Sequence, residues 1–406
     1  MRKCRSLKAL TKTNYHKFLR LAFPFGVLNK DLKLIFASNL LGSFGDGLFA
    51  FLLPVYATET LNAGSVEVGI LYAVVILVNA LTLFAAGMIA DRYDRKKIMI
   101  AGWIAWVPVP LIFSLAQNWV QMLPGMVLWG VWLGGPTGTA YIVTAADKSK
   151  LTLTFTAISS AWSLGYIFSP AIGGYLGGTV GMRVVFYSAF ALYGLAAVAL
   201  TFIRSQRALG FAERVSEKGC SFFDLLRTRK LLKLSIFFAL TMFTIMLFRP
   251  FIPTFLAEVR DYGDFEIGIL GSVAFFGSAI LGILLGRVGD KWGRSRAFAA
   301  SMILGSLSTT LLLAINDFTI LIFTFFLAGG SYITWSLMSA TIGALAPESI
   351  RARWISIPQT VTMFSSFVAP YIGGVLYASS QYYPFIVAIV ATLFLAYLVT
   401  TGVFEK

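Results

Sequence analysis

Residues 87–96 read GMIADRYDRK, and residues 286–295 repeat the pattern as GRVGDKWGRS, 199 positions later. The repetition extends beyond this motif. The triplet GIL at 69–71 recurs at 268–270 with the same offset, and PAIGG at 170–174 matches PYIGG at 370–374 with an offset of 200. A half-chain repeat with two apolar halves indicates two similar helical bundles that face each other in a membrane.

The composition places most of the chain in lipid. Of its 406 residues, 58% are hydrophobic and only 13% are charged, and the mean hydropathy is +0.79. A soluble domain is usually about one quarter charged. Apolar stretches of the roughly 17–25 residues that a bilayer core requires predict an all-α integral membrane protein with twelve spans. These stretches lie at 33–57, 66–90, 98–117, 119–143, 153–176, 182–203, 233–257, 264–286, 297–315, 318–343, 354–378 and 381–402.

The basic residues that give the net charge of +15 are distributed along the chain as in a multi-span membrane protein. Basic residues gather in the first 33 positions and in alternate loops, whereas the loops of the other side carry only Arg183 and Arg260. Because lysine and arginine stay on the cytoplasmic side, both termini are expected in the cytoplasm, with the chain in the plasma or inner membrane. The charge therefore indicates topology and contact with anionic lipid rather than binding to nucleic acid.

The expected domain order has five parts. They are a basic cytoplasmic tail at 1–32, a six-helix bundle at 33–203, a cytoplasmic linker at 204–232, a second six-helix bundle at 233–402 and a short cytoplasmic end at 403–406. Within the linker, Ser221 is typical of the N-cap of a short surface helix. Cys4 and Cys220 do not form a disulfide pattern, and no metal, nucleotide or nucleophile motif appears, so neither a cofactor nor an enzyme is expected.

Two six-helix halves, with G-x-x-x-D-R/K-x-G-R-K/R between spans 2 and 3 and again between spans 8 and 9, resemble the major facilitator superfamily. The segment SPAIGG at 169–174 also resembles the fifth-helix motif that exporters of this family often carry. Two departures stand out. Asp94 replaces the first motif's glycine, a form similar to the macrolide-efflux branch, and residues 125–135 lack the arginine usual in proton-coupled drug antiporters.

The resemblance implies a gate on the cytoplasmic side. Glycines in the motif would let neighbouring helices approach closely. By the same resemblance, the two aspartates would face the starts of the eleventh and fifth spans across the halves and hold this side shut. For the basic residues, an equal alternative is that they only set the topology. The expected gating residues are Gly87, Asp91, Arg92, Arg95, Gly286, Asp290, Lys291 and Arg294.

The PxxGG segments of spans 5 and 11 predict kinks with tight packing beside them. A proline breaks the helical hydrogen-bond ladder, and a glycine pair permits a close helix contact. Packing without a switching role is the simpler interpretation for each segment alone. The residues are Pro170, Gly173, Gly174, Pro370, Gly373 and Gly374.

Two charges lie inside the expected membrane spans. Asp46 is 13 residues beyond Lys33, about 20 Å along the helix, and Arg249 is 16 residues beyond Lys233, about 24 Å. Translocon scales put a central charge at about 2.5–3.5 kcal/mol, so neither side chain should face lipid. Both are expected to point into a central cavity between the halves. The Pro250 that follows Arg249 predicts a distorted helix there.

Three interpretations of Asp46 remain open. It could carry protons, attract a cationic substrate, or neutralise Arg249 as a structural ion pair. It lies on a polar face of span 1 with Asn39, Gly42 and Ser43, which predicts a cavity-facing stripe. Other cavity candidates are Tyr141, Thr144, Trp162, Tyr166, Trp335 and Gln359, of which Tyr141, Trp335 and Gln359 rank highest.

The sequence thus predicts a monomeric secondary transporter that works by alternating access. Its expected function is proton-coupled efflux of small amphipathic or hydrophobic compounds, powered by a proton gradient through Asp46. One alternative is uptake or uniport of an anionic metabolite bound by Arg249. Another is a non-transporting membrane receptor or lipid-binding scaffold, because a fold alone does not fix a function.

Overall fold

The computed structural model describes residues 26, 28–90, 93–207, 229–345 and 351–401, and these residues form helices and loops without a strand. The first half contains α2 (Lys30–Ala50), α3 (Leu53–Val55), η2 (Tyr56–Thr60), α4 (Ser65–Ala90), α5 (Arg95–Trp106), α6 (Pro108–Leu115), η3 (Trp119–Met122), α7 (Leu123–Gly130), α8 (Gly134–Ala145), η4 (Lys148–Lys150), α9 (Leu151–Val180) and α10 (Met182–Thr201). The second half contains α12 (Arg229–Phe248), η6 (Arg249–Phe251), α13 (Ile252–Glu258), α14 (Asp264–Trp292), α15 (Arg294–Ala314), α16 (Phe318–Tyr332), α17 (Thr334–Leu345), α18 (Arg351–Ser366), α19 (Ala369–Ser379) and α20 (Tyr383–Thr400).

The helices follow the twelve apolar stretches closely. Among the described residues, nine helices are long and apolar enough to cross a membrane, and the bent pair formed by α2 with α3 and η2 makes a tenth. The other two expected spans are also helical. The stretch at 119–143 becomes η3, α7 and α8, and the stretch at 153–176 lies within α9. The surface helix expected at 221–227 lies outside the described residues.

Prolines account for several of the breaks. α5 ends just before Pro108, and α12 ends just before Arg249 and Pro250, where the chain forms the 3₁₀ turn η6. A proline cannot donate to the preceding turn, so the helix stops or bends there. The distortion expected at Arg249 is therefore confirmed. Pro370 likewise lies in the first turn of α19, after a break from α18, whereas α9 continues through Pro170.

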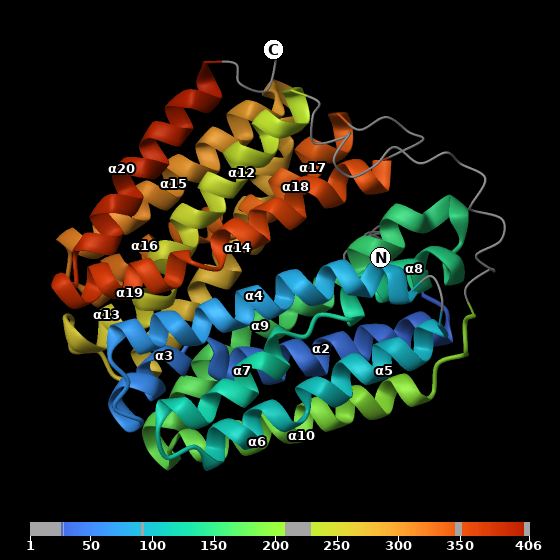
Figure 1. Ribbon diagram of the computed structural model, residues 1–406, viewed down its shortest axis with the longest axis horizontal. Coiled ribbons are helices and arrows are strands. Elements are labelled where there is room, and N and C mark those ends of the chain that lie inside the picture. The colour runs from blue at the N-terminus through green and yellow to red at the C-terminus, as the bar shows by residue number, and fades with distance from the viewer. Residues whose placement is uncertain (1–25, 27, 91–92, 208–228, 346–350, 402–406) are drawn as a thin grey trace, which may run out of the picture.

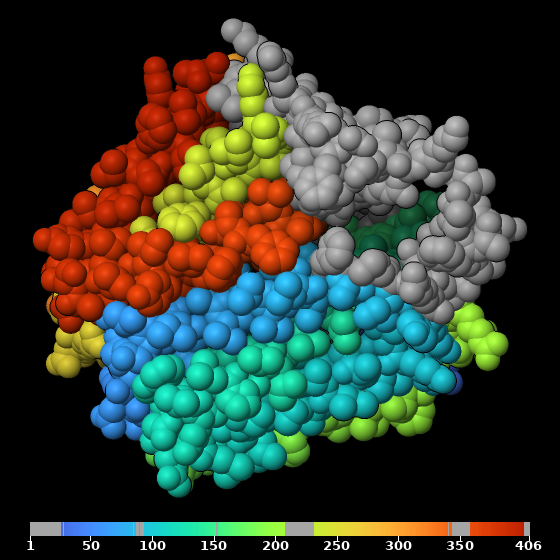
Figure 2. Space-filling model, in the orientation of Figure 1, coloured from blue at the N-terminus to red at the C-terminus, as the bar shows by residue number. Residues whose placement is uncertain are grey.

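The two halves form two bundles that lie side by side at one end and diverge toward the other (Figure 1). We call the diverging end the basic end, because α5 and α15 begin there at Arg95 and Arg294. We call the other the opposite end, where α4 and α14 begin. Along the face in Figure 2, α4 packs against α18 and α19 of the second half.

The halves meet at the opposite end through two equivalent contacts. A methyl group on Gly268 of α14 would lie 2.3 Å from the carbonyl oxygen of Pro170 in α9. In the repeat-related contact, a methyl group on Gly69 of α4 would lie 2.4 Å from the carbonyl oxygen of Pro370 in α19. Both distances are far below van der Waals contact, so only glycine allows the backbones to approach this closely.

The glycine pairs of the PxxGG segments pack on both sides of these contacts. A methyl group on Gly173 would lie 1.8 Å from a carbonyl of its own half, and one on Gly174 would lie 2.2 Å from the carbonyl of Asp264 in the other half. Gly373 and Gly374 repeat this arrangement at 1.9 and 2.4 Å. The tight packing expected from the sequence is confirmed, and it fastens the first and second halves together.

Candidate functional site

Asp46 is the centre of a polar cluster inside the first half. It lies on α2 and is only 4% exposed. Its neighbours Gly45 and Gly47 let other helices approach, because a methyl group on Gly45 would meet the Tyr193 ring at 3.2 Å and one on Gly47 would meet Ser169 Oγ at 1.9 Å. The sequence around Asp46 therefore permits neighbouring helices to pack directly against the carboxylate.

Three neutral donors hold this carboxylate. Trp129 Nε1 of α7 donates to Asp46 Oδ1 at 2.8 Å, and the Tyr193 hydroxyl of α10 donates to the same oxygen at 2.5 Å. The Tyr166 hydroxyl of α9 donates to Oδ2. Burying a carboxylate is costly unless it is hydrogen-bonded, and these donors supply those bonds. No cation pairs with Asp46 among the described residues.

Arg249 is held separately, by an aromatic ring. Its guanidinium carbon lies 3.6 Å from the centre of the Tyr332 ring, a cation–π contact. Tyr332 contacts Phe275 at 5.2 Å between ring centres, and Phe275 contacts Tyr166 at 4.5 Å. The two membrane charges are thus connected across the halves by three aromatic rings rather than by an ion pair.

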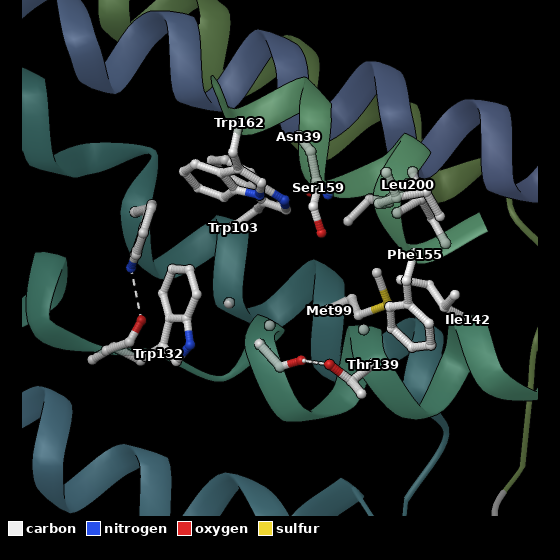
Figure 3. Close-up of a pocket in the computed structure, with 18 residues that line it drawn as sticks. Asn39, Met99, Trp103, Trp132, Thr139, Ile142, Phe155, Ser159, Trp162 and Leu200 are labelled. Carbon is white, nitrogen blue, oxygen red and sulfur yellow. Dashed lines mark hydrogen bonds between the residues drawn. The ribbon is translucent and has the colours of Figure 1, made fainter. Parts of the chain in front are cut away.

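A cavity of about 190 Å³, drawn in Figure 3, is lined by Trp103 and Trp162, whose rings contact Tyr193 and Tyr166 of this cluster. All of its lining residues belong to the first half, Asn39 among them, whereas the cavity expected from the sequence lay between the halves. Gly42 and Ser43, expected on the same stripe, instead pack within the bundle. A methyl group on Gly42 would meet the Trp103 ring at 1.8 Å, and Ser43 Oγ donates to the Ala161 carbonyl at 3.2 Å.

The three highest-ranked cavity candidates lie away from this cavity. Tyr141 is buried near the basic end, where its hydroxyl donates to the Arg204 carbonyl at 2.8 Å. Trp335 packs against the core of the second half. Gln359 Nε2 donates to Ser339 Oγ at 3.1 Å. Whether any of them contacts a substrate stays a prediction.

Two lower-ranked candidates, Trp162 and Tyr166, lie at the site instead. With Phe155 and Ser159 they occupy one face of α9 at spacings of four, three and four residues, a pattern visible in the sequence. Trp129 is a site residue that the sequence does not indicate. It comes from a short helix whose apolar sequence gives no indication of a polar partner.

The first copy of the gating motif is described in part. Asp91 and Arg92, and the surroundings of Gly87, lie outside the described residues. Arg95 Nη1 donates to the Ala140 carbonyl at 3.1 Å and to Thr144 Oγ1 at 2.7 Å, so it ties α5 to α8 within the first half.

Asp94, which stands where the family motif has a glycine, has a structural role. Its carboxylate accepts hydrogen bonds from the backbone N–H of Lys96 at 2.9 Å and from Ser205 Oγ. It thereby caps α5 and fastens the chain that leaves α10. Partial burial raises the pKa of Asp94, but the hydrogen bonds from Ser205 and the backbone outweigh this effect and hold the pKa below its usual value. The matching Gly293 instead adopts φ = 99°, which suits glycine.

The second copy is exposed at the basic end. Asp290, Lys291 and Arg294 all face solvent, and the described residues place no partner from the first half against them. A methyl group on Gly286 would meet nothing within 4 Å. The close approach expected at Gly286 is therefore wrong for this conformation, because the halves diverge here.

Solved transporters share this architecture. The nucleoside transporter NupG superposes with a TM-score of 0.75 at 14% identity, covering 93% of this chain and 100% of its own. A bacterial homologue of the iron transporter ferroportin, in an inward-facing state, gives a TM-score of 0.73 at 14% identity over the same shares. At these identities the likeness concerns the fold alone.

Several relatives of this chain are named as drug-resistance proteins. Multidrug resistance protein 2 of Bacillus subtilis (strain 168) is 25% identical over 372 residues, which cover 88% of this chain and 92% of that one. The multi-drug resistance efflux pump PmrA of Streptococcus pneumoniae is 28% identical over 278 residues, covering 66% and 68%. The family match itself spans residues 35–264 and 234–405. The chain is thus a multi-pass membrane transporter that belongs to the Major Facilitator Superfamily.

Proposed function

We propose that this transporter exports small amphipathic or hydrophobic compounds in exchange for protons, with Asp46 as the proton carrier. The observation that carries the proposal is a buried carboxylate held by three neutral donors, with no cation beside it among the described residues. The efflux relatives support the direction of transport.

The donors suit a group that changes protonation. A tyrosine hydroxyl can donate to a carboxylate and can equally accept from a carboxylic acid. Tyr166 and Tyr193 could therefore rotate and keep a hydrogen bond to Asp46 after it takes up a proton. The indole N–H of Trp129 can only donate, so it would keep donating to an unprotonated lone pair of the carboxyl group. An ion pair with a cation would lack this adaptability, because protonation removes the attraction.

Alternating access would use the contacts at the opposite end. In the conformation described here the halves are fastened there and apart at the basic end, which the topology predicts to be cytoplasmic. Closing the basic end would bring Asp91 and Asp290 of the two gating motifs toward their expected partners. We expect one chain to suffice for this cycle, since the site is built within a single chain.

Transport of an anion held by Arg249 is the weaker alternative. The space beside Arg249 measures about 20 Å³, room for about one water molecule. The guanidinium also already lies against the Tyr332 ring.

Reconstituted vesicles test the proposal. With a proton gradient, uphill transport of a lipophilic dye should disappear in Asp46→Asn while counterflow of the dye persists, because the binding space remains. The matched control is Asp147→Asn, which removes a carboxylate from an exposed turn. Undiminished uphill transport by the Asp46 variant would refute the coupling role.

A further inference from the structure

The cavity beside Asp46 lies within one bundle rather than between the two. Its walls come from α2, α5, α8, α9 and α10, together with the break between α7 and α8. The lining residues include no charged side chain. A ligand bound here would therefore contact only the first half and would meet no formal charge.

Four indoles line the cavity, and three of them, Trp103, Trp132 and Trp162, are labelled in Figure 3. The ring centres of Trp103 and Trp106 lie 5.5 Å apart, those of Trp106 and Trp132 lie 5.4 Å apart, and those of Trp132 and Trp162 lie 6.0 Å apart. Trp106 is fixed by a 2.7 Å hydrogen bond from Nε1 to the Val131 carbonyl. Such a continuous run of aromatic rings favours a planar aromatic guest.

Glycines make room for these rings. A methyl group on Gly42 would lie 1.8 Å from the Trp103 ring, and one on Gly135 would lie 2.1 Å from Trp132 Nε1. Trp103 and Trp132 thus pack directly against glycine backbone. This packing fixes the two indoles before a ligand binds and lowers the entropic cost of ordering them on binding.

Polar groups without partners stand on the same wall. The Asn39 amide, the Ser159 hydroxyl and the indole N–H of Trp162 make no hydrogen bond with any other described residue. Asn39 of α2 and Ser159 of α9 both line the cavity (Figure 3). Together they offer donors and an acceptor to a neutral polar substituent.

The volume limits the size of the guest. An engineered protein cavity of about 150 Å³ holds benzene, and a water molecule occupies about 30 Å³ of liquid. The cavity here, at about 190 Å³, therefore fits one aromatic ring with one small substituent. A fused multi-ring compound would extend beyond this volume.

We propose that this cavity binds neutral single-ring aromatic compounds that carry an amide-like or hydroxyl substituent. The ring would lie among the indoles, and the substituent would meet Asn39 and Ser159. This proposal rests on the proposed export function, since it names the substrate class and the half that holds it.

Calorimetric titration of the purified transporter with benzamide tests the site. Gly138 lines the cavity, and a methyl group there would meet only the Met99 terminal carbon at 3.8 Å, so Gly138→Leu should fill the cavity and weaken binding at least tenfold. Asn39→Leu should weaken it about 3- to 10-fold, the value of one hydrogen bond. The matched control is Gly194→Leu on α10, where a methyl group meets nothing within 4 Å.

Further compounds and variants sharpen the test. Benzoate and cyclohexanecarboxamide should bind more weakly than benzamide, because one carries a charge and the other lacks the ring. Ser159→Leu, at an exposed position of the lining, gives a second blocked variant if Gly138→Leu does not fold. Unchanged benzamide binding in the folded blocked variants would overturn the proposal. So would binding of benzoate as tight as that of benzamide.

The two proposals fail differently. Benzamide binding that depends on Gly138 and Asn39, without any proton-driven transport in vesicles, would refute the export function and leave the site standing. Proton-driven dye export that persists in a Gly138→Leu variant unable to bind benzamide would place that substrate elsewhere and leave the export function intact.

Discussion

Adding one methyl group at Gly268 should shift the transporter away from the conformation described here. The new carbon would lie 2.3 Å from the Pro170 carbonyl oxygen, whereas ordinary van der Waals contact begins near 3.4 Å. α9 and α14 must therefore separate by about 1 Å at the opposite end. Only the state in which these helices touch is affected, because the methyl group has space once they part.

Overpacking of this kind typically costs about 1–3 kcal/mol. A difference of that size changes the ratio of two conformations by about 5- to 150-fold. Helix propensity favours alanine over glycine equally in both states, so it cancels. The equivalent variant Gly69→Ala, whose methyl group would lie 2.4 Å from the Pro370 carbonyl oxygen, should have a similar effect.

Spin labels on the two halves can measure this shift. Thr179 and Ser379 are exposed near the opposite end of α9 and α19, and labelled cysteines there report the separation by double electron–electron resonance. Gly268→Ala should increase the population with a long distance. Gly194→Ala is the control, since its methyl group meets nothing within 4 Å. Distance distributions in Gly268→Ala that match this control would refute the reasoning.

Three further outcomes are expected. Asp94→Ala should lower the free energy of unfolding by about 0.5–2 kcal/mol, the value of an N-cap, with a smaller loss for Ser205→Ala in thermal melts. Because the pKa of Asp94 is lowered on folding, this contribution is present above the usual carboxyl range and lost as the pH falls below it, so the melting difference should vanish in acid. Tyr141→Phe should cost about 0.5–1.5 kcal/mol of stability through the lost bond to Arg204, yet leave benzamide titrations unchanged; weakened binding would contradict its position outside the cavity. Tyr166→Phe should slow proton-driven dye transport in vesicles while the variant remains folded in thermal melts. Equal transport by variant and parent would argue against its part in holding Asp46.

The sequence predicted the helix contacts of the PxxGG segments better than it predicted the partners of the gating residues. The PxxGG segments were expected to pack tightly, and they do, because a glycine pair lets two helix backbones approach closely wherever it occurs. For Arg95, a gate between the halves and a role in topology alone were equal alternatives, and in this conformation it ties α5 to α8 inside one half. A long basic side chain reaches several partners, and its sequence motif does not select among them.

The sequence by itself determined the membrane class, the two-fold repeat, the helix positions and the two charges inside the membrane spans. These follow from apolar runs of fixed length and from the cost of a charge in lipid, which are properties of local sequence. Only the tertiary structure decided what surrounds Asp46. Trp129 and Tyr193 are 83 and 147 residues away along the chain, and Arg249 lies beside Tyr332 instead of Asp46. Such meetings depend on how helices rotate and pack against one another, and many rotations satisfy the same apolar pattern when lipid and protein interior are equally apolar.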